Sequence, residues 1–454
     1  MKRFITTLNN IWNIEELRKR ILLTLGLLAV YRFGAFVVLP GVDASRIQAT
    51  DPAEGAKDLL DLINTFTGGA FNSASIFALG IMPYITASII IQLLGFAVPY
   101  FQRLQKDGET GRKKLTQITR ALTLAITFVQ GTAYLQKVIG DGLVMDGISL
   151  SLFTICNLIV LSAGTIFAMW LGERITDRGV GNGVSLLITI GIIASLPQSF
   201  AAELGAQSGT FLILILELAA LFGIIMITVL IVQGVRRIPV QYAKQVSGRG
   251  SNIAGMKMQN ERDFIPLKVN AAGVMPIIFA QAILFLPATV GQYFLANGGE
   301  AGSLYQQLVN PFSVLSSALA FILVVGFTYI YTALMVNPKE YANYLKNMNA
   351  FIPGVKPGQP TADLIDTITS RITLPGSVFL GIIAILPAFA VAAGVNQGFA
   401  IFFGGTSLLI LVAVVLDTLA QIESYLLLKH YDGLMKSGRI QGKQSRMNNI
   451  GAQM

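Results

Sequence analysis

Long apolar runs, separated by short polar segments, recur along the whole chain of 454 residues. A helix needs about 20 predominantly apolar residues to cross the hydrocarbon core of a bilayer. Runs of about this length lie at 21–39, 76–98, 118–137, 151–171, 182–200, 211–235, 270–292, 313–336, 374–394 and 398–420. The pattern predicts an all-α membrane protein with ten transmembrane helices. The first run is retained as a span, because no small-residue cleavage site follows it.

Two of these runs begin with the same motif. The letters GIMP, 80–83, open the second run, and GVMP, 273–276, open the seventh. The ten runs divide five and five around 197–210, and an odd number of spans turns the second half upside down relative to the first. Matching glycine- and proline-interrupted segments in inverted halves indicate a site between the halves. We therefore expect an N-terminal half at 1–200, a C-terminal half at 201–425 and a tail at 426–454.

The basic residues gather in alternate connecting segments. With the N-terminus in the cytoplasm, 29 of the 33 Lys and Arg residues lie on the cytoplasmic side. The opposite side holds Arg46, Lys57 and Lys137, while Arg32 lies inside the first run. Because Lys and Arg favour cytoplasmic loops, the pattern places both termini in the cytoplasm. The net charge of +9 therefore follows from topology and does not indicate a DNA partner.

Composition agrees with a membrane protein and argues against an enzyme. The chain is 53% hydrophobic and 13% charged, with a mean hydropathy of +0.64, whereas soluble proteins carry about 25% charged residues. A single Cys156 and a single His430 cannot build a Cys/His zinc site. The stretch GETGRKK, 108–114, lacks the spacing of a phosphate-binding loop. The sequence predicts no metal, no cofactor and no catalytic site.

Few ionisable residues fall inside the predicted spans. Arg32, Glu217 and Asp417 lie near span ends, so we expect interfacial anchors or local ion pairs and no proton or sodium relay. Isoleucine and valine are abundant at helical spacing instead. Ile85 and Ile89 share one helix face, as do Val184 and Ile188. Ordinary helix packing and the lining of a pore both account for this spacing.

Three segments are unusual for simple connections. The stretch 56–75 has an apolar face followed by a Gly68–Gly69 break, and it is too short to cross lipid. It is either an external loop or a short helix that enters a cavity, since irregular backbone at membrane depth requires protein or water around it. The segments 235–270 and 337–376 are large and basic or proline-rich. They are either solvated loops or docking surfaces for an acidic protein or RNA phosphate.

Five stretches resemble the SecY family, which forms the pore of the bacterial protein-export translocon. They read FALGIMPYITASIIIQLL, RITDRGVGNGVSLLI, RRIPVQYAKQ, AGVMPIIFA and FFGGTSLLILVAVVLDTLAQIES, and the likeness extends over about 1–440. The resemblance implies a clamshell of two inverted five-helix halves around a channel for unfolded secretory polypeptides, with a lateral gate that releases membrane segments sideways. An inverted-repeat secondary transporter of a small solute is the alternative. The scarcity of buried ionisable residues argues against it.

The resemblance also implies roles for particular residues. It implies a pore ring of Ile85, Ile89, Val184, Ile188, Ile278 and Ile410. It implies a short plug helix near 58–72, which includes Leu60, Ile63, Asn64, Phe66, Gly68 and Gly69. Lateral-gate positions are Pro83, Ser88, Gln92, Gln130, Pro276 and Gln281. The cytoplasmic loops 236–268 and 337–374 offer Arg236, Arg237, Lys244, Arg249 and Lys356 for docking, with lysine at 356 where the family usually has arginine.

Partners and location follow from the same resemblance. It implies the membrane subunits SecE and SecG, the motor ATPase SecA, the ribosome, signal peptides, the translocating polypeptide and membrane lipid as partners. It implies a multi-pass protein of the bacterial inner membrane.

Overall fold

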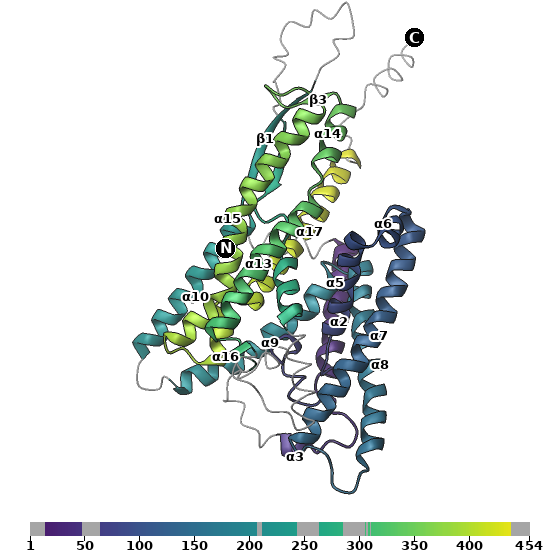
Figure 1. The fold of residues 1–454 in the computed structure, drawn as a ribbon, viewed down its shortest axis with the longest axis vertical. Helices are drawn as coiled ribbons and strands as arrows, with labels where there is room; N and C mark the ends of the chain where they lie inside the picture. The colour runs from purple at the N-terminus through teal and green to yellow at the C-terminus, as the bar shows by residue number, and fades with distance from the viewer. Residues whose placement is uncertain are drawn as a thin grey trace, which may run out of the picture.

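The computed structural model describes residues 14–47, 64–206, 211–242, 263–284, 305, 307–308 and 310–436. Long helices run side by side in two groups (Figure 1). One group comes from the first half of the chain: α2 (Glu15–Gly34), α5 (Met82–Ala97), α7 (Gly108–Gly140) and α8 (Leu150–Arg178). The other comprises α10 (Phe211–Val232), α13 (Val314–Met335), α15 (Gln359–Ala392) and α17 (Gly405–Lys436). Helix α9 (Gly183–Ala206) packs against members of both groups.

Helices lie at all of the predicted runs, although they are unequal in length and apolarity. Among the described residues, six helices are long and apolar enough to cross a membrane: α8, α9, α10, α13, α15 and α17. Helix α5 and the short α6 (Pro99–Lys106) form a seventh candidate, bent by 98° at their junction. The seventh predicted run is represented by a shorter apolar helix, Met275–Leu284. These helices agree with the predicted membrane architecture.

Proline causes the bend between α5 and α6. The ring of Pro99 disfavours helical backbone at the residue before it. Val98 is accordingly extended, with φ −117° and ψ 120°. The chain then restarts as α6, whose Leu104 is buried while Tyr100 is exposed. The predicted second span therefore ends in a short helix that turns sharply away from it.

The two motif-led helices begin in the same way. Gly80 and Gly273 both have left-handed backbone, with φ of 53° and 65°, a conformation that glycine adopts without a Cβ clash. The helices then begin at Met82 and Met275, each followed by proline. Proline suits the first turn of a helix, where its missing N–H has no intrahelical partner. The predicted equivalence of the two motifs is therefore confirmed as local structure.

The tenth predicted run is not one continuous helix. It consists of α16 (Gln397–Ala400), the 3₁₀ turn η1 (Ile401–Phe403) and then α17. The chain is extended at Gly404, where a methyl group would lie 2.6 Å from the Ile383 carbonyl oxygen of α15. Only glycine allows the two backbones to approach so closely. The extended residue interrupts the helix of the tenth predicted run.

The described residues of the cytoplasmic segments predicted at 236–268 and 337–374 form strands and helices. Strand β1 (Val235–Tyr242) pairs antiparallel with β2 (Asp263–Lys268) and, on its other edge, with β3 (Ala350–Phe351), so the sheet order is β2-β1-β3. The sheet shares an apolar core with α14 (Pro338–Asn347) and the first turns of α15. The core residues are Ile238, Val240, Leu267, Leu345, Ala350, Ile352 and Ile365. We call this unit the cap; its sheet is an addition to the predicted all-helical fold.

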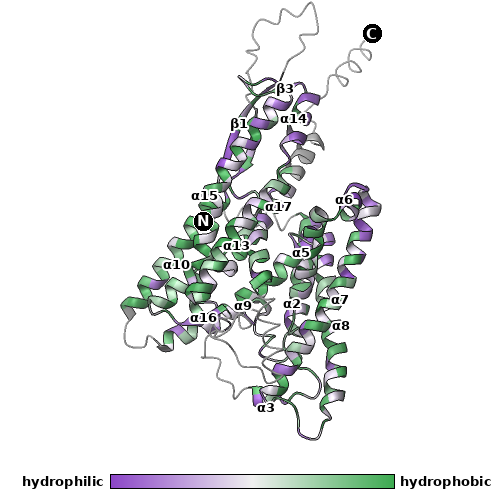
Figure 2. Ribbon diagram, in the orientation of Figure 1, coloured by the Kyte–Doolittle hydropathy of each residue, from purple (hydrophilic) through white to green (hydrophobic). Residues whose placement is uncertain are grey.

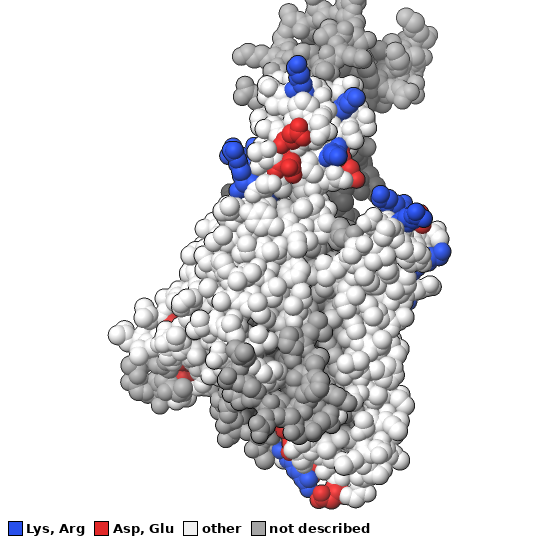
Figure 3. Space-filling model, viewed as in Figure 1, with Lys and Arg blue, Asp and Glu red and all other residues white. Residues whose placement is uncertain are grey.

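Charge is concentrated at the two ends of the molecule. On the face drawn in Figure 3, Lys and Arg lie on the cap and around α6, and a wide belt that shows no Lys or Arg separates them from the charges near α3 (Ala44–Ile47). Figure 2 shows hydrophobic helices across the same belt. The cap and α6 therefore share one end, as the predicted alternation of the connecting segments requires.

Candidate functional site

Aliphatic side chains from both helix groups meet near the middle of the molecule. Ile85 and Ile89 come from α5, Val184 and Ile188 from α9, Ile278 from the helix Met275–Leu284, and Ile410 from α17. All six belong to one apolar cluster. Four of them are buried, whereas Val184 and Ile278 are half-buried. The structure thus brings together the six residues that the resemblance assigns to a pore ring.

A small cavity lies among these side chains. Ile85, Ile188, Ile278 and Ile410 line it together with Phe66. Its few polar neighbours already have partners: the Thr86 hydroxyl donates to the Met82 carbonyl at 3.1 Å, and the Gln281 amide donates to the Thr406 hydroxyl. The isoleucine tips offer no hydrogen-bonding atom. An apolar constriction of this kind obstructs ions because water leaves it.

Phe66 belongs to a segment that packs against the cluster from one side. After a single helical turn at 64–67, the chain continues through turns to α5, with Gly68 and Gly69 in left-handed backbone at φ 66° and 91°. The predicted break at this glycine pair is therefore confirmed. The Asn64 side chain accepts from the Asn72 backbone N–H at 3.0 Å, which closes the turn. Leu60 and Ile63, also predicted in the plug, lie outside the described residues.

Side chains of the first helix group hold this segment by its carbonyl groups. The Arg32 guanidinium of α2 donates to the Gly68 carbonyl, and the Tyr134 hydroxyl of α7 donates to the Phe71 carbonyl at 2.7 Å. The Lys137 ammonium lies 5.1 Å from the centre of the Phe71 ring. Arg32, for which the sequence predicts an interfacial anchor or a local ion pair, thus contacts the backbone of this segment.

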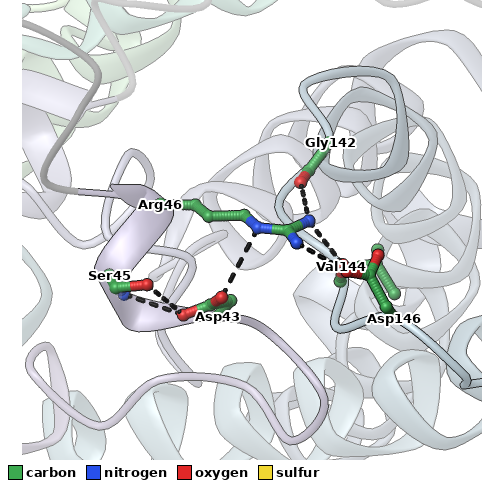
Figure 4. A network of polar contacts seen from close by, with 6 residues as sticks. All are labelled: Asp43, Ser45, Arg46, Gly142, Val144 and Asp146. Atoms are coloured by element: carbon green, nitrogen blue, oxygen red, sulfur yellow. Dashed lines mark hydrogen bonds and ion pairs between the residues drawn. The ribbon is translucent and has the colours of Figure 1, made fainter.

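Arg46 fixes the outer end of the same half (Figure 4). Its guanidinium donates to the carbonyls of Gly142 and Val144 at 3.0 and 3.2 Å and pairs with Asp146 at 2.9 Å. These partners belong to the turn between α7 and α8. Arg46 therefore joins the connection after α2 to the α7–α8 turn.

The neighbouring carboxylate of Asp43 completes this contact. The Ser45 hydroxyl and backbone N–H donate to it at 2.6 and 3.0 Å, and Arg46 lies 3.4 Å away. The Ser45 hydrogen bonds, with a smaller contribution from Arg46, lower the pKa of Asp43. Asp43 therefore remains charged at neutral pH and orients Arg46.

A polar contact crosses the seam between the two helix groups at the predicted gate. The Tyr331 hydroxyl of α13 donates to Gln92 of α5 at 3.3 Å, and the Gln92 amide donates to Ser88 at 3.3 Å. The Tyr331 ring lies 5.6 Å from that of Phe279, centre to centre. Tyr331 was not predicted; its only signal in the sequence was a hydroxyl within an apolar run.

The other predicted gate and docking residues are distributed as follows. Pro83 and Pro276 begin their helices, and Gln130 is half-buried on α7. Arg236 and Arg237 are exposed on β1, Lys356 lies just before α15, and Lys244 and Arg249 lie outside the described residues. The Arg237 guanidinium lies 4.7 Å above the ring of Phe264, so this side chain already has a contact within the cap.

The fold and the site define a class: a helical membrane channel in which two helix groups enclose an apolar constriction. Comparison with known proteins identifies the family. The SecY family model matches residues 75–419. The chain is 41% identical over 453 residues to protein translocase subunit SecY of Streptomyces coelicolor, covering 95% of this chain and all of that protein. It is 38% identical over 464 residues to the subunit of the same name from Chlamydia muridarum, with 97% and 100% covered.

The chain therefore belongs to the SecY family. Solved structures agree on the fold. "The structure of a protein conducting channel" matches with a TM-score of 0.62 at 18% identity, covering 89% of this chain and 91% of that one. Sec61 in a canine ribosome–channel complex matches at 0.60 with the same identity and coverage. A SecY structure in which the plug domain stabilises the closed channel matches at 0.59 and 18%, again with 89% and 91% covered.

Membership in this family determines the function. The chain is the channel subunit of a protein translocase, and it is not an enzyme. The alternative of a small-solute transporter is set aside, because the relatives that match nearly the whole chain are translocase subunits.

Proposed function

We propose that unfolded secretory polypeptides cross the membrane through the apolar constriction, with Ile85, Ile89, Val184, Ile188, Ile278 and Ile410 as the pore ring. One observation carries the proposal: these residues come from four helices in both halves of the chain and still form one cluster, and four of them line one cavity. Branched aliphatic groups form a compliant seal. They also give a sliding peptide no hydrogen bond that would retain it.

The segment 64–75 contains the described part of the plug, 64–72, and its role is to close the ring from the outer side. Phe66 supports this assignment, since it is 6% exposed and lines the cavity with four ring residues. In a related SecY structure, the plug domain is described as stabilising the closed state and maintaining a membrane seal.

The lateral gate is the seam between two pairs of helices. One pair is α5 and α7, and the other is the helix Met275–Leu284 and α13. Pro83, Ser88, Gln92, Gln130, Pro276 and Gln281 belong to it, and Tyr331 joins them. The contact between Tyr331 and Gln92 is a single neutral hydrogen bond, which is weak enough to break reversibly. Signal peptides and membrane segments leave sideways through this seam into lipid.

The cap is the docking surface for the ribosome and for the motor ATPase SecA, and SecE and SecG complete the complex in the membrane. The ribosome is supported by the relation to Sec61 in a ribosome–channel complex. Arg236, Arg237 and Lys356 are the described basic side chains that serve this role, with Lys244 and Arg249 beyond the described residues.

The halves 1–200 and 201–425 form the clamshell in the bacterial inner membrane, and the tail 426–454 and both termini face the cytoplasm. The distribution of 29 of 33 basic residues supports this orientation.

Crosslinking tests the pore directly. The native Cys156 is exposed on α8 and is first replaced by serine. A cysteine in place of Ile278 should form a disulfide with a cysteine in a stalled secretory chain. A cysteine in place of Ile159, which is 62% exposed on the outer face of α8, is the matched control and should not. Equal crosslinking at both positions, or none at Ile278, would contradict the pore assignment.

A further inference from the structure

The segment 64–75 is attached to the N-terminal half by its backbone. Irregular backbone at membrane depth must find hydrogen-bond partners, because lipid supplies none. Some of these backbone groups pair within the segment. The Gly69 N–H donates to the Asn64 carbonyl at 2.9 Å, and the Ser73 N–H donates to the Gly69 carbonyl at 3.1 Å. The carbonyls of Gly68 and Phe71 are reached by side chains from other helices.

We propose that Arg32 and Tyr134 are positioning residues that hold the segment 64–75 against the pore ring through these two carbonyls and thereby set how readily the channel opens. The two donors approach from different helices, α2 and α7. A cationic donor forms a stronger hydrogen bond than a neutral one. Arg32 is the stronger of the two restraints for this reason.

The packing around Arg32 keeps its guanidinium in place. Its central carbon lies 4.9 Å from the centre of the Phe36 ring, on the turn that follows α2. A methyl group at Gly68 would come within 2.6 Å of the guanidinium, so glycine at this position lets the donor approach the backbone. Arg32 and Gly68 therefore fit together in shape as well as through their hydrogen bond.

Helix α9 supplies the surface against which the two donors hold the segment. A methyl group at Gly191 would lie 2.0 Å from the Phe66 carbonyl oxygen, so only glycine permits this contact. A methyl group at Gly68 would lie 3.0 Å from the Gly191 Cα atom. The backbone of the segment thus lies directly on the backbone of α9, next to Ile188 of the ring.

All of these attachments come from the N-terminal half, whereas Phe66 also faces Ile278 and Ile410 of the other half. The segment is therefore fastened on one side and packed by apolar contact on the other. Loss of either carbonyl contact therefore weakens the attachment of the segment to the N-terminal half but leaves the helix packing of both halves unchanged. The closed state loses stability relative to the open state, and the channel opens more often at rest.

The test compares matched variants in the complete translocase complex. Arg32→Gln removes the charge, and Tyr134→Phe removes only the hydroxyl. Lys19→Gln, on the same helix as Arg32, and Tyr100→Phe, on α6, are controls, since both side chains lie on the exposed surface. Resting ion conductance is measured in proteoliposomes, and export of a precursor with a weakened signal peptide is measured in cells.

Tyr134→Phe should raise resting conductance by about twofold to tenfold and Arg32→Gln by about tenfold or more, the losses expected for a neutral and for a charged hydrogen bond, and both should increase export of the weakened precursor. The controls should do neither. A merely structural role would instead lower protein level and export. Wild-type conductance and export in the Arg32→Gln/Tyr134→Phe double variant would overturn the proposal.

The inference rests on the proposed plug, and a second background separates the two. Residues 66–73 are deleted and replaced by a shorter Gly-Ser linker, so that the carbonyls contacted by Arg32 and Tyr134 are lost. If that channel does not leak, the plug assignment fails and the inference with it. If it leaks but Arg32→Gln and Tyr134→Phe do not leak in the native background, only the inference fails. The inference also fails if these substitutions add leakage in the linker background, because they then act elsewhere. Leakage in the native background alone supports it.

Discussion

Isoleucine suits the proposed constriction because it combines two properties. Its branched side chain fills space while remaining deformable, and it has no atom that binds a passing peptide. The cavity is lined by Ile85, Ile188, Ile278 and Ile410, each of which comes from a different helix. Each of these side chains is also part of a large apolar cluster. A packing role and a sealing role therefore predict different results when the side chain is replaced.

Replacement of Ile85, Ile188 and Ile278 together by serine should wet the constriction and raise ion conductance while protein level remains close to wild type. Conductance and protein amount are measured in the same membranes. Leu161→Ala is the control, because Leu161 is fully buried in a different cluster of the N-terminal half. It should cost about 2–5 kcal/mol of stability through a cavity and lower protein level without leakage. A triple variant that is lost in the same way, without leakage, would identify the isoleucines as ordinary packing residues.

At the scale of secondary structure, a hydrogen bond joins the two helix groups at the proposed gate. Gln92 of α5 and Tyr331 of α13 share one hydrogen bond, the Gln92 amide also donates to Ser88, and Tyr331 packs against the apolar cluster. Removal of this bond should shift the seam toward opening. A double-mutant cycle measures the coupling energy of the pair.

Tyr331→Phe and Gln92→Ala should each increase export of a precursor with a weakened signal peptide, and the double variant should add little to either. The expected coupling is about 0.5–1.5 kcal/mol, the usual net value of a neutral hydrogen bond. Tyr329→Phe on the same helix is the control, since that ring is 39% exposed. Fully additive effects would show that the two side chains act independently and that the bond does not restrain the gate.

The helices could be predicted from sequence because their signals are local. Apolar length located the spans, and the Gly-x-Met-Pro motif located the start of two of them. The cap could not be predicted, since β1 has a short alternating pattern at Ile238 and Val240, a proline between them, and a partner strand that follows only after α13 and α14. Contacts such as that of Arg32 with the Gly68 carbonyl also depend on three-dimensional proximity, and a carbonyl partner leaves no trace in residue type.

At the scale of the whole molecule, the two halves are joined away from the gate by contacts of α2, α9 and α17. The Gly181 N–H donates to Gln421 at 2.8 Å, and the Arg20 guanidinium lies 5.0 Å from the Tyr425 ring centre. At the opposite end of α9, Glu203 accepts from the Asn396 N–H at 3.0 Å. Movement at the gate can therefore occur while these contacts keep the halves together.

The orientation in the membrane can be tested with reporter fusions. Fusions at Gly108 and Gly358 should report the cytoplasm, because α6 and the cap share the basic end of the molecule. A fusion at Gly205, at the end of α9, should report the outside. A periplasmic signal from Gly108 or Gly358 would contradict the inverted arrangement of the halves.

The cap leads to a separate prediction, since its two arginines are not equivalent. Arg237 lies over the Phe264 ring, and its replacement disturbs the cap itself. Arg236 is exposed on the same strand, and its charge is available to an acidic or phosphate-bearing partner. Arg236→Glu should therefore weaken binding of the ribosome or of SecA several-fold, with the loss largest at low salt, because exposed charges are screened by added salt.

Binding to purified complexes at two salt concentrations measures this effect, and circular dichroism verifies that the fold is retained. Lys339→Glu on α14 makes the same charge change elsewhere on the cap and is the matched control. If both variants weaken binding equally, the overall charge of the cap is responsible and not the position of Arg236. If binding of both partners is unaffected by Arg236→Glu but lost with Lys339→Glu, the docking surface lies on α14. Arg236 then serves only the membrane topology.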